Sequence, residues 1–373
     1  MSSTVHMAAS RKLVTVARSM AAFVAMALTG VAPLAIGREL LLTGAKPDRL
    51  IVIDTATRSI QSIFHIPDAN GSLFTIVAAP NGRIAYVLVD RMERIVGIDL
   101  KSGKIVFRAD LSRPDERVKD FFALTVTPDG KELIAYELPV LLKPNEYQVA
   151  EPRFAVFRTN AGLQAQAVRT YPAPRRLHML LMRPNGKSFY ALGFDLYEYD
   201  IRTGKLLGKR GIQHWTLPAH SQPDLLAFWP STEPTGVFVS PVYSDVKTGD
   251  KTVARTGLMS LDLRSGALEF QDFEDSSALI FSTVLSPDRE RVFGVYSTLS
   301  EIDITHHTLA RRKPLDHTYY SVNISADGHQ LYIGGAMCDV GFYDTATLEK
   351  TANLKLPDCT DQSLASLRVI QSR

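Results

Sequence analysis

Two cysteines, Cys338 and Cys359, are the residues best suited to covalent chemistry in this 373-residue chain. They lie 21 positions apart (359 − 338), and neither belongs to the Cys-x-x-Cys-His motif that attaches a c-type haem. In an oxidising compartment the pair could instead form a disulfide, which would add up to about 3 kcal/mol by restricting the unfolded chain. We favour this disulfide over two separate thiols, and we expect no haem attached to this chain.

Other arrangements that would support catalysis or metal binding do not emerge from the sequence. The adjacent His306 and His307 fall in an expected turn, where neighbouring side chains rarely converge on one metal, so we interpret them as surface histidines. The sequence contains no Gly-x-Ser-x-Gly, P-loop, His-Glu-x-x-His or Rossmann glycine motif. We therefore predict neither a catalytic residue nor a metal site on this chain.

Aromatic and histidine side chains gather instead in the segments that connect successive repeats of the chain. These candidate partner-binding residues are Phe121, Phe122, His178, Trp215, Phe281, His317, Tyr319 and Tyr320, with Phe74 and His220 near them. Aromatic side chains together with arginines at one rim are typical of protein–protein hot spots. For any single residue we favour packing between neighbouring sheets, whereas the set as a whole indicates a binding surface.

The elements that position these residues follow from a repeat built around one turn. "RLIVIDTATRSI" near the start and "VGFYDTATLEKT" near the end share the turn DTAT, and similar stretches lie between them. Their anchor positions are Asp54, Asp99, Arg158, Asp200, Asp262, Asp303 and Asp344, separated by 45, 59, 42, 62, 41 and 41 residues. Each repeat has the alternating apolar pattern and turn residues of a β-hairpin. A base period near 42 residues predicts an all-β fold, a β-propeller with one four-stranded blade per repeat.

A second signal, Pro-Asp/Asn-Gly, precedes most anchors, as in "APNGRIAYV" and "TPDGKELIAY". Each blade is therefore expected to run strand A, Pro-Asp-Gly turn, strand B, loop, strand C, Asp turn and strand D. The two kinds of turn share one face of the disc, and the B–C and D–A loops share the other. Two insertions, 139–152 and 240–256, fall between strands B and C and enlarge the second face, either for binding or as neutral elaboration.

The two ends of the chain complete the pattern. The segment "RELLLTG" from Arg38 resembles a strand B without a strand A, and "QSLASLRVIQS" at the end resembles a strand A without a strand B. We expect these ends to pair in one shared blade, which closes a seven-bladed ring and removes exposed sheet edges. Residues 38–373 are thus predicted to form a single propeller domain.

The first 37 residues differ from the rest. Arg11, Lys12 and Arg18 precede an apolar stretch that ends in small residues and is shorter than the ~20 residues of a spanning helix. We interpret residues 1–37 as a secretory signal rather than an uncleaved anchor, and we expect an exported mature chain without a membrane span. Removing the signal removes the net charge of +3 (42 − 3 = 39 basic against 39 acidic residues), and no basic stripe indicates nucleic-acid binding.

The sequence resembles the β subunit of quinohemoprotein amine dehydrogenase over essentially the whole mature chain. The most specific stretches are "HTYYSVNIS" and "SRPDERVK", and "AKPDRLIVIDT", "GRIAYV" and "SLASLRV" also match. The propeller repeats alone are less specific, because many exported propellers share them, including the methylamine dehydrogenase heavy chain.

This resemblance implies a periplasmic heterotrimer that oxidises primary amines. In that family a small γ subunit carries a quinone made from its own tryptophan, and an α subunit carries two c-type haems and passes electrons to an external acceptor. The β propeller carries neither cofactor, in agreement with the absent haem motif. The resemblance transfers no catalytic residue; it implies that the open face docks the partners and helps enclose the amine pocket.

Two other functions remain open. A free-standing exported propeller would bind a ligand or a scaffold protein through the same face. A lactonase-like hydrolase would need acids that converge on a metal in the central channel, but the expected inner strands, such as "FTIVA" and "FALTV", offer no carboxylates. The sequence therefore favours the partner-binding subunit.

Overall fold

The computed structural model describes residues 37–362 and 364–372. The secretory signal predicted for residues 1–37 therefore lies outside the described residues, apart from Gly37. The regular secondary structure of the described chain is β-strand, apart from two short 3-10 turns, η1 (Gly162–Gln164) and η2 (Pro357–Cys359). None of its helices is long and apolar enough to cross a membrane.

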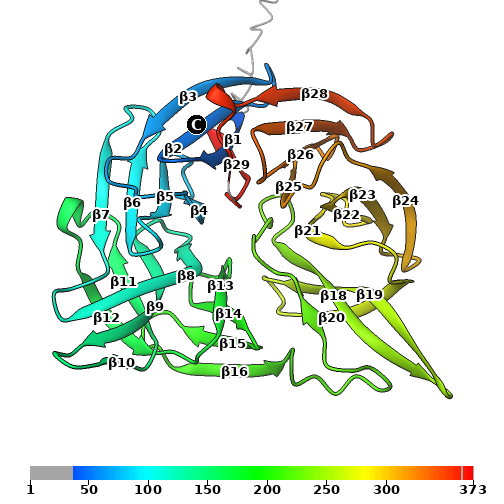
Figure 1. Ribbon diagram of the computed structural model, residues 1–373, viewed down its shortest axis with the longest axis horizontal. Helices are drawn as coiled ribbons and strands as arrows, with labels where there is room; N and C mark the ends of the chain where they lie inside the picture. Colours follow the sequence, from blue (N-terminus) through cyan, green and yellow to red (C-terminus); the bar gives the residue numbers. More distant parts are fainter. Residues whose placement is uncertain (1–36, 363, 373) are drawn as a thin grey trace, which may run out of the picture. The chain divides into compact units, whose positions relative to one another are not determined.

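The strands form seven antiparallel sheets, arranged as blades around a common centre (Figure 1). Blade 1 contains β29 (Arg368–Ser372), β1 (Arg38–Ala45), β2 (Arg49–Asp54) and β3 (Ser59–His65). Blade 2 contains β4 (Ile76–Ala78), β5 (Ile84–Val89), β6 (Arg94–Asp99) and β7 (Ile105–Asp110). Blade 3 contains β8 (Glu116–Val126), β9 (Glu132–Leu142), β11 (Arg153–Arg158) and β12 (Ala167–Pro172), with the additional β10 (Tyr147–Val149) beside β9.

The remaining four blades have four strands each. Blade 4 contains β13 (Leu177–Met182), β14 (Ser188–Gly193), β15 (Asp195–Asp200) and β16 (Leu206–Gly211). Blade 5 contains β17 (Asp224–Leu225), β18 (Val237–Thr248), β19 (Lys251–Asp262) and β20 (Leu268–Asp275). Blade 6 contains β21 (Ile280–Leu285), β22 (Arg291–Tyr296), β23 (Thr298–Asp303) and β24 (Thr308–Pro314). Blade 7 contains β25 (Ser321–Ile324), β26 (Gln330–Gly334), β27 (Asp339–Asp344) and β28 (Lys350–Lys355).

Within each blade these strands run from the inner strand A to the outer strand D. Inner strands are largely buried because neighbouring blades cover both of their faces, and β25 is buried along its whole length. Outer strands alternate between partly buried and exposed residues, as in β12 and β28, because only one of their faces meets another blade. This gradient explains why the sequence shows apolar runs for inner strands and alternation for outer ones.

The repeated aspartate closes the C–D turn of its blade, as predicted. In both DTAT turns the side chain accepts a hydrogen bond from the backbone N–H three residues later, at 2.8 Å for Asp54 and Thr57 and at 2.8 Å for Asp344 and Thr347. The A–B and C–D turns share one side of the disc, here called the turn face, and the B–C and D–A connections share the other, the loop face. The recurrence of DTAT therefore reflects one local hydrogen bond, used in neighbouring blades.

The ring is closed by the two ends of the described chain. β29 pairs with β1 in antiparallel register, with Leu40 opposite Ile370 and Leu41 opposite Val369. A fully buried amide, Gln362, strengthens this junction, because its oxygen accepts hydrogen bonds from Thr43 Oγ1 at 3.0 Å and from the Gly335 N–H at 3.1 Å. The prediction of a seven-bladed β-propeller closed by a shared terminal blade is confirmed.

Both predicted insertions enlarge the B–C connections of their blades. In blade 5 the inserted residues lengthen β18 and β19, which form one hairpin that is paired as far as Thr248 and Lys251. In blade 3 the inserted residues extend β9 and add β10, and a partly buried ion-pair network holds the extension in place. Arg153 donates to Glu116 at 2.8 Å and to Glu137 at 2.6 Å.

Two loop-face connections of blade 7 carry the cysteines, the B–C loop and the segment that follows strand D. Cys338 lies just before β27 and Cys359 lies in η2, and a disulfide joins them. The bond ties the B–C loop of blade 7 to the segment that leads into the closing strand β29.

Deleting residues 368–373 should open the ring. Because Val369 and Ile370 are almost fully buried and contribute about 2 kcal/mol each, we expect the free energy of unfolding to fall by about 4 kcal/mol or more in urea titrations. A synthetic peptide covering residues 364–373, added in excess, should restore part of the loss. An unchanged unfolding midpoint in the truncated protein would contradict closure by β29.

Replacing both Cys338 and Cys359 with serine should lower stability without changing the fold. The bond closes a loop of 21 residues, for which chain entropy gives a loss of about 3 kcal/mol. Urea unfolding of the oxidised protein, with the variant and the reduced wild type as comparisons, measures this difference. If all three unfold at the same concentration, the disulfide does not constrain the chain.

Candidate functional site

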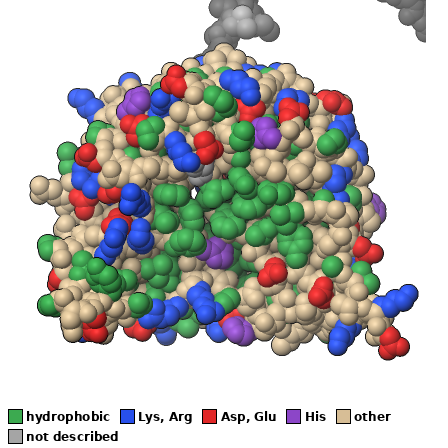
Figure 2. All heavy atoms as spheres, in the orientation of Figure 1, with side chains coloured by type: hydrophobic (Ala, Val, Ile, Leu, Met, Phe, Trp, Pro, Cys, Tyr) green, Lys and Arg blue, Asp and Glu red, His purple; other side chains and the backbone are tan. Residues whose placement is uncertain are grey.

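Eight aromatic side chains from five blades form one continuous array towards the loop face. The array consists of Phe74, Phe121, Phe122, Phe228, Trp229, Phe281, Tyr296 and Tyr320, whose neighbouring ring centroids lie 4.7 to 6.3 Å apart. Most contacts are edge-to-face, and Phe228 stacks on Phe281 at 5.1 Å. Figure 2 shows hydrophobic side chains gathered across the middle of one face of the molecule. We call this set the aromatic array.

Phe121 and Phe122 are presented by a bulge in the inner strand of blade 3. The β8–β9 register shifts between Asp120 and Leu124, and Phe122 adopts a φ of 66°. Asp120 holds this conformation because its Oδ1 accepts a hydrogen bond from the Ala123 N–H at 2.8 Å. The left-handed backbone of a bulky residue costs on the order of 1 to 3 kcal/mol. This backbone conformation leaves the Phe121 side chain 42% exposed and buries Phe122 against its neighbours.

Asp120 itself is a buried acid. Burial raises its pKa to about 8, and the neighbouring Glu137 carboxylate acts in the same direction. Its second oxygen, Oδ2, has no hydrogen-bond partner among the described residues. Burial therefore favours the protonated, uncharged form of this side chain, next to the apolar rings of Phe121 and Phe122.

A second component of the array comes from a segment that leaves its own blade. Between strands A and B, blades 2, 3, 4, 6 and 7 use five residues, whereas blade 5 uses the eleven residues 226–236. The prolines Pro230 and Pro234 lack the N–H that a ladder needs, so β17 pairs only briefly with β18. We call residues 226–236 the channel segment; it includes Phe228 and Trp229.

The channel segment reaches the inner strands of distant blades. Ser231 Oγ donates to the Val322 carbonyl of blade 7 at 2.8 Å. Glu233 pairs with Arg368 of the closing strand β29 at 2.8 Å, and both side chains are largely buried. Trp229 contacts Phe122 of blade 3, with ring centroids 5.4 Å apart. Figure 1 shows the green connection that leads into β18 lying beside β25. The segment therefore contacts the inner strands of blades 7, 1 and 3 and links the array to them.

Exposed apolar side chains favour the same face. Twelve large hydrophobic residues are exposed among the described residues, and eight of them belong to loop-face segments. These eight are Phe121, Leu142, Tyr147, Val149, Phe194, Leu217, Leu279 and Met337. The turn face instead carries hydrogen-bonded aspartates. Such an asymmetry is typical of a surface that another molecule covers.

The structure unites half of the predicted rim residues. Phe121, Phe122, Phe281 and Tyr320 belong to the aromatic array, as does Phe74. Sequence reasoning missed Phe228, Trp229 and Tyr296, which complete it. Two features of the sequence could have pointed to the channel segment: its extra length, and its Trp-Pro and Glu-Pro dipeptides.

The other predicted rim residues lie elsewhere. Trp215 packs on Phe270 of the outer strand β20, and its Nε1 donates to the Ser221 carbonyl at 2.8 Å. His178 has no ring contact with the array; burial lowers its pKa to about 4, and its Nε2 has no partner among the described residues.

The two remaining residues belong to the junction of blades 6 and 7. Tyr319 is fully buried there, where burial raises its pKa, and its ring lies 4.0 Å from that of His317. His317 Nε2 lies 2.9 Å from Asp339 Oδ1. Burial alone would raise the pKa of Asp339, but hydrogen bonds from Asn353, His317 and Lys355 hold it below its usual range.

The chemistry available to this site is recognition by contact. In the described part of the chain, no group of three or more His, Cys, Asp or Glu side chains is placed to hold a metal ion. His306 and His307 do not converge, because His306 Nδ1 bonds Asp303 at 2.8 Å and His307 lies along a groove between blades 5 and 6. The array offers a partly exposed apolar surface whose rings contact one another across five blades.

No protein-family model matches the chain, and no curated protein matches it in sequence. Among solved structures, hydrazine synthase of Kuenenia stuttgartiensis is similar with a TM-score of 0.54 and 11% identity, over 83% of this chain and 90% of that one. Dihydro-heme d1 dehydrogenase NirN is similar with a TM-score of 0.54 and 13% identity, over 89% of this chain and 75% of that one. At these identities the likeness establishes the propeller fold.

Replacing Asp120 with asparagine should stabilise the protein at alkaline pH. The folded state raises the pKa of this acid from 3.8 to about 8, so the unfolded chain releases the proton first and wild-type stability falls as pH rises between these values. Asparagine mimics the protonated acid and can still accept from Ala123. We expect similar stability at pH 4 and a gain of about 2 kcal/mol or more at pH 8.

Urea titrations at both pH values measure this difference, with the exposed Asp115→Asn as the control that should show none. An equal effect of Asp120→Asn at both pH values would show that folding does not raise the pKa of Asp120.

Proposed function

We propose that this chain is the non-catalytic propeller subunit of a periplasmic quinohemoprotein amine dehydrogenase complex. In this role the loop face docks a small quinone-bearing subunit and a dihaem cytochrome c subunit, and the complex oxidatively deaminates primary amines. The chain itself binds neither cofactor. The observation that carries the proposal is the aromatic array, which places an ordered apolar surface at the centre of one face.

The architecture of the array suits docking. Its rings are fixed by contacts between five blades, so a partner would meet a surface that loses little conformational entropy on binding. Phe121 is the most exposed ring and stands beside the buried Phe122, an arrangement that resembles an anchor surrounded by supporting contacts. The family resemblance of "HTYYSVNIS" supports the same assignment, because its second tyrosine is Tyr320 of the array.

An amine-oxidising site also needs protection from water. A quinone on a partner subunit would gain this protection if the array covered its amine pocket, because apolar walls exclude solvent from the reacting groups. Export to an oxidising compartment is consistent with the Cys338–Cys359 disulfide. These features support the proposed location and role together.

Affinity purification of the tagged chain from its native cells tests this function. We expect haem absorbance in the purified complex and amine-dependent reduction of an electron-accepting dye. Phe121→Ser should weaken the association by about tenfold or more, because truncating an anchor aromatic costs on the order of 2 kcal/mol. Leu207→Ser, at an exposed leucine of the outer strand β16, should leave the association unchanged.

A haem-free monomer without amine-dependent dye reduction would refute the complex. That outcome would favour a free-standing exported propeller that binds its ligand through the loop face. Equal losses for Phe121→Ser and Leu207→Ser would instead show that the array is not the docking surface.

A further inference from the structure

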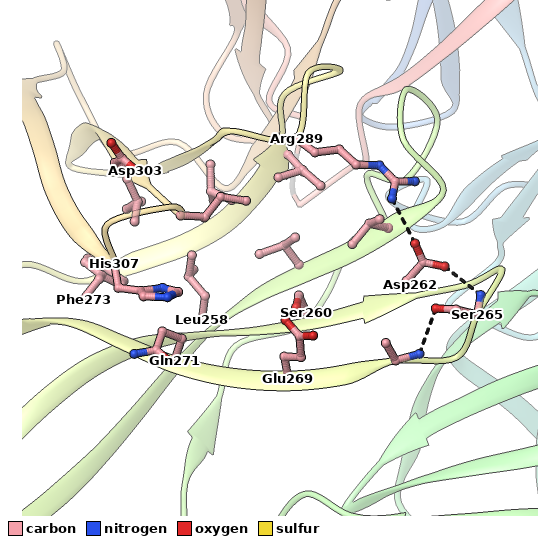
Figure 3. Close-up of a pocket in the computed structure, with 17 residues that line it drawn as sticks. Leu258, Ser260, Asp262, Ser265, Glu269, Gln271, Phe273, Arg289, Asp303 and His307 are labelled. Atoms are coloured by element: carbon pink, nitrogen blue, oxygen red, sulfur yellow. Dashed lines mark hydrogen bonds and ion pairs between the residues drawn. The ribbon is translucent and has the colours of Figure 1, made fainter.

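The junction of blades 5 and 6 contains a cavity with an apolar floor. Aromatic rings interlock elsewhere, as Tyr86 and Phe107 do beside blade 3 and as Tyr332 and Phe342 do beside blade 1. At the junction of blades 5 and 6 the facing side chains are aliphatic apart from Phe273. A cavity of about 310 Å³ remains there, open towards the turn face (Figure 3).

Two residues of blade 5 leave this space empty. Ser260 stands two positions before the anchor Asp262, where blade 7 has Phe342 two positions before Asp344. Opposite Ser260 on the outer strand is Glu269, whereas in blade 2 the corresponding pair is Gly97 and Phe107. A serine and a carboxylate thus occupy the two positions at which blades 2 and 7 each place one aromatic ring.

The floor of the cavity is apolar and accessible. Its hydrophobic lining consists of Val237, Val239, Leu258, Phe273, Leu285, Val292 and Ile302. The first five retain 4 to 8% exposure, whereas most core residues at the other junctions retain less. A cavity of this size is at the lower end of the range for small-molecule sites and fits an apolar group such as one ring.

The rim of the cavity is acidic. Three carboxylates border it, from Asp262, Glu269 and Asp303, against one guanidinium, that of Arg289. Arg289 is already engaged, because it donates to Asp262 at 3.1 Å and to the Thr235 carbonyl at 2.7 Å.

The other rim groups differ in how far they are engaged. Asp303 accepts two backbone N–H groups of its own turn, from Thr305 and His306. Glu269 has no ion-pair or hydrogen-bond partner among the described residues, and the same holds for the side chains of Gln271 and His307 (Figure 3). The free groups around the apolar floor are therefore one carboxylate, one amide and one imidazole.

We propose that this cavity binds a small amphiphilic cation, with its apolar body on the floor and a single protonated amine beside Glu269. Charge complementarity favours a cation over an anion, because an anionic ligand would meet three carboxylates and no free guanidinium. Gln271 and His307 supply acceptors for the remaining N–H groups of the amine. The site lies on the turn face and does not depend on the proposed docking function of the loop face.

Isothermal titration of the purified full chain with 2-phenylethylammonium tests the site, with 2-phenylethanol as the uncharged probe of similar shape. We expect millimolar or tighter binding of the cation and weaker binding of the alcohol. Glu269→Gln should weaken the binding of the cation by about threefold to fivefold, as expected for a partly exposed ion pair, and should leave the affinity for the alcohol unchanged. Glu290→Gln, at an exposed acid outside the cavity, removes the same charge and should have no effect.

A second variant tests the floor. Ser260→Phe places a ring where blade 7 already carries one, so it should abolish binding of both probes while preserving or raising the thermal midpoint. If this variant does not fold, the comparison of Glu269→Gln with Glu290→Gln decides alone. The proposal is overturned if the wild type binds neither probe at millimolar concentration, if cation and alcohol bind equally, or if Glu269→Gln and Glu290→Gln behave alike.

Discussion

The pairing of β29 with β1 is the interaction on which the structure depends. Each blade buries its faces only because a neighbour stands on either side, so an open ring would leave two apolar sheet faces and two unpaired edges. Five residue pairs between the chain ends prevent this, from Arg38 with Ser372 to Leu42 with Arg368. Gln362 and the disulfide fasten the same junction. The aromatic array depends on this closure, because its rings come from several blades whose relative positions the closed ring maintains.

Much of this architecture could be predicted from local patterns. The anchors from Asp54 to Asp344 located all seven C–D turns, because six of the turns depend on a side-chain hydrogen bond of their aspartate within a few residues, and Arg158 stands at the same place in blade 3. The ends of the chain could be matched because "RELLLTG" and "SLRVIQS" each lack a partner strand. These features are encoded within one blade, and so they appear in the sequence.

The features that escaped prediction depend on contacts between blades. The channel segment has neither alternation nor a turn motif, and its bond from Ser231 to Val322 joins positions 91 residues apart. Its aromatic residues therefore gave no sign of meeting Phe122 or Phe281. The cavity between blades 5 and 6 was equally hidden, because Ser260 and Glu269 are unremarkable until the side chains that face them are known. Trp215 shows the opposite case, since an aromatic residue in a D–A loop can pack outward on a strand D.

The channel segment also changes how the ring distributes its stability. In a simple array of repeats each unit contacts only its two neighbours, and stability adds along the chain. Here residues of blade 5 are bonded directly to the inner strands of blades 7 and 1, and they pack on blade 3. The channel segment thus links blades that are not adjacent, so the local unfolding of one blade removes contacts from several others. The propeller should consequently behave as a single cooperative body, without the stepwise fraying of an open solenoid.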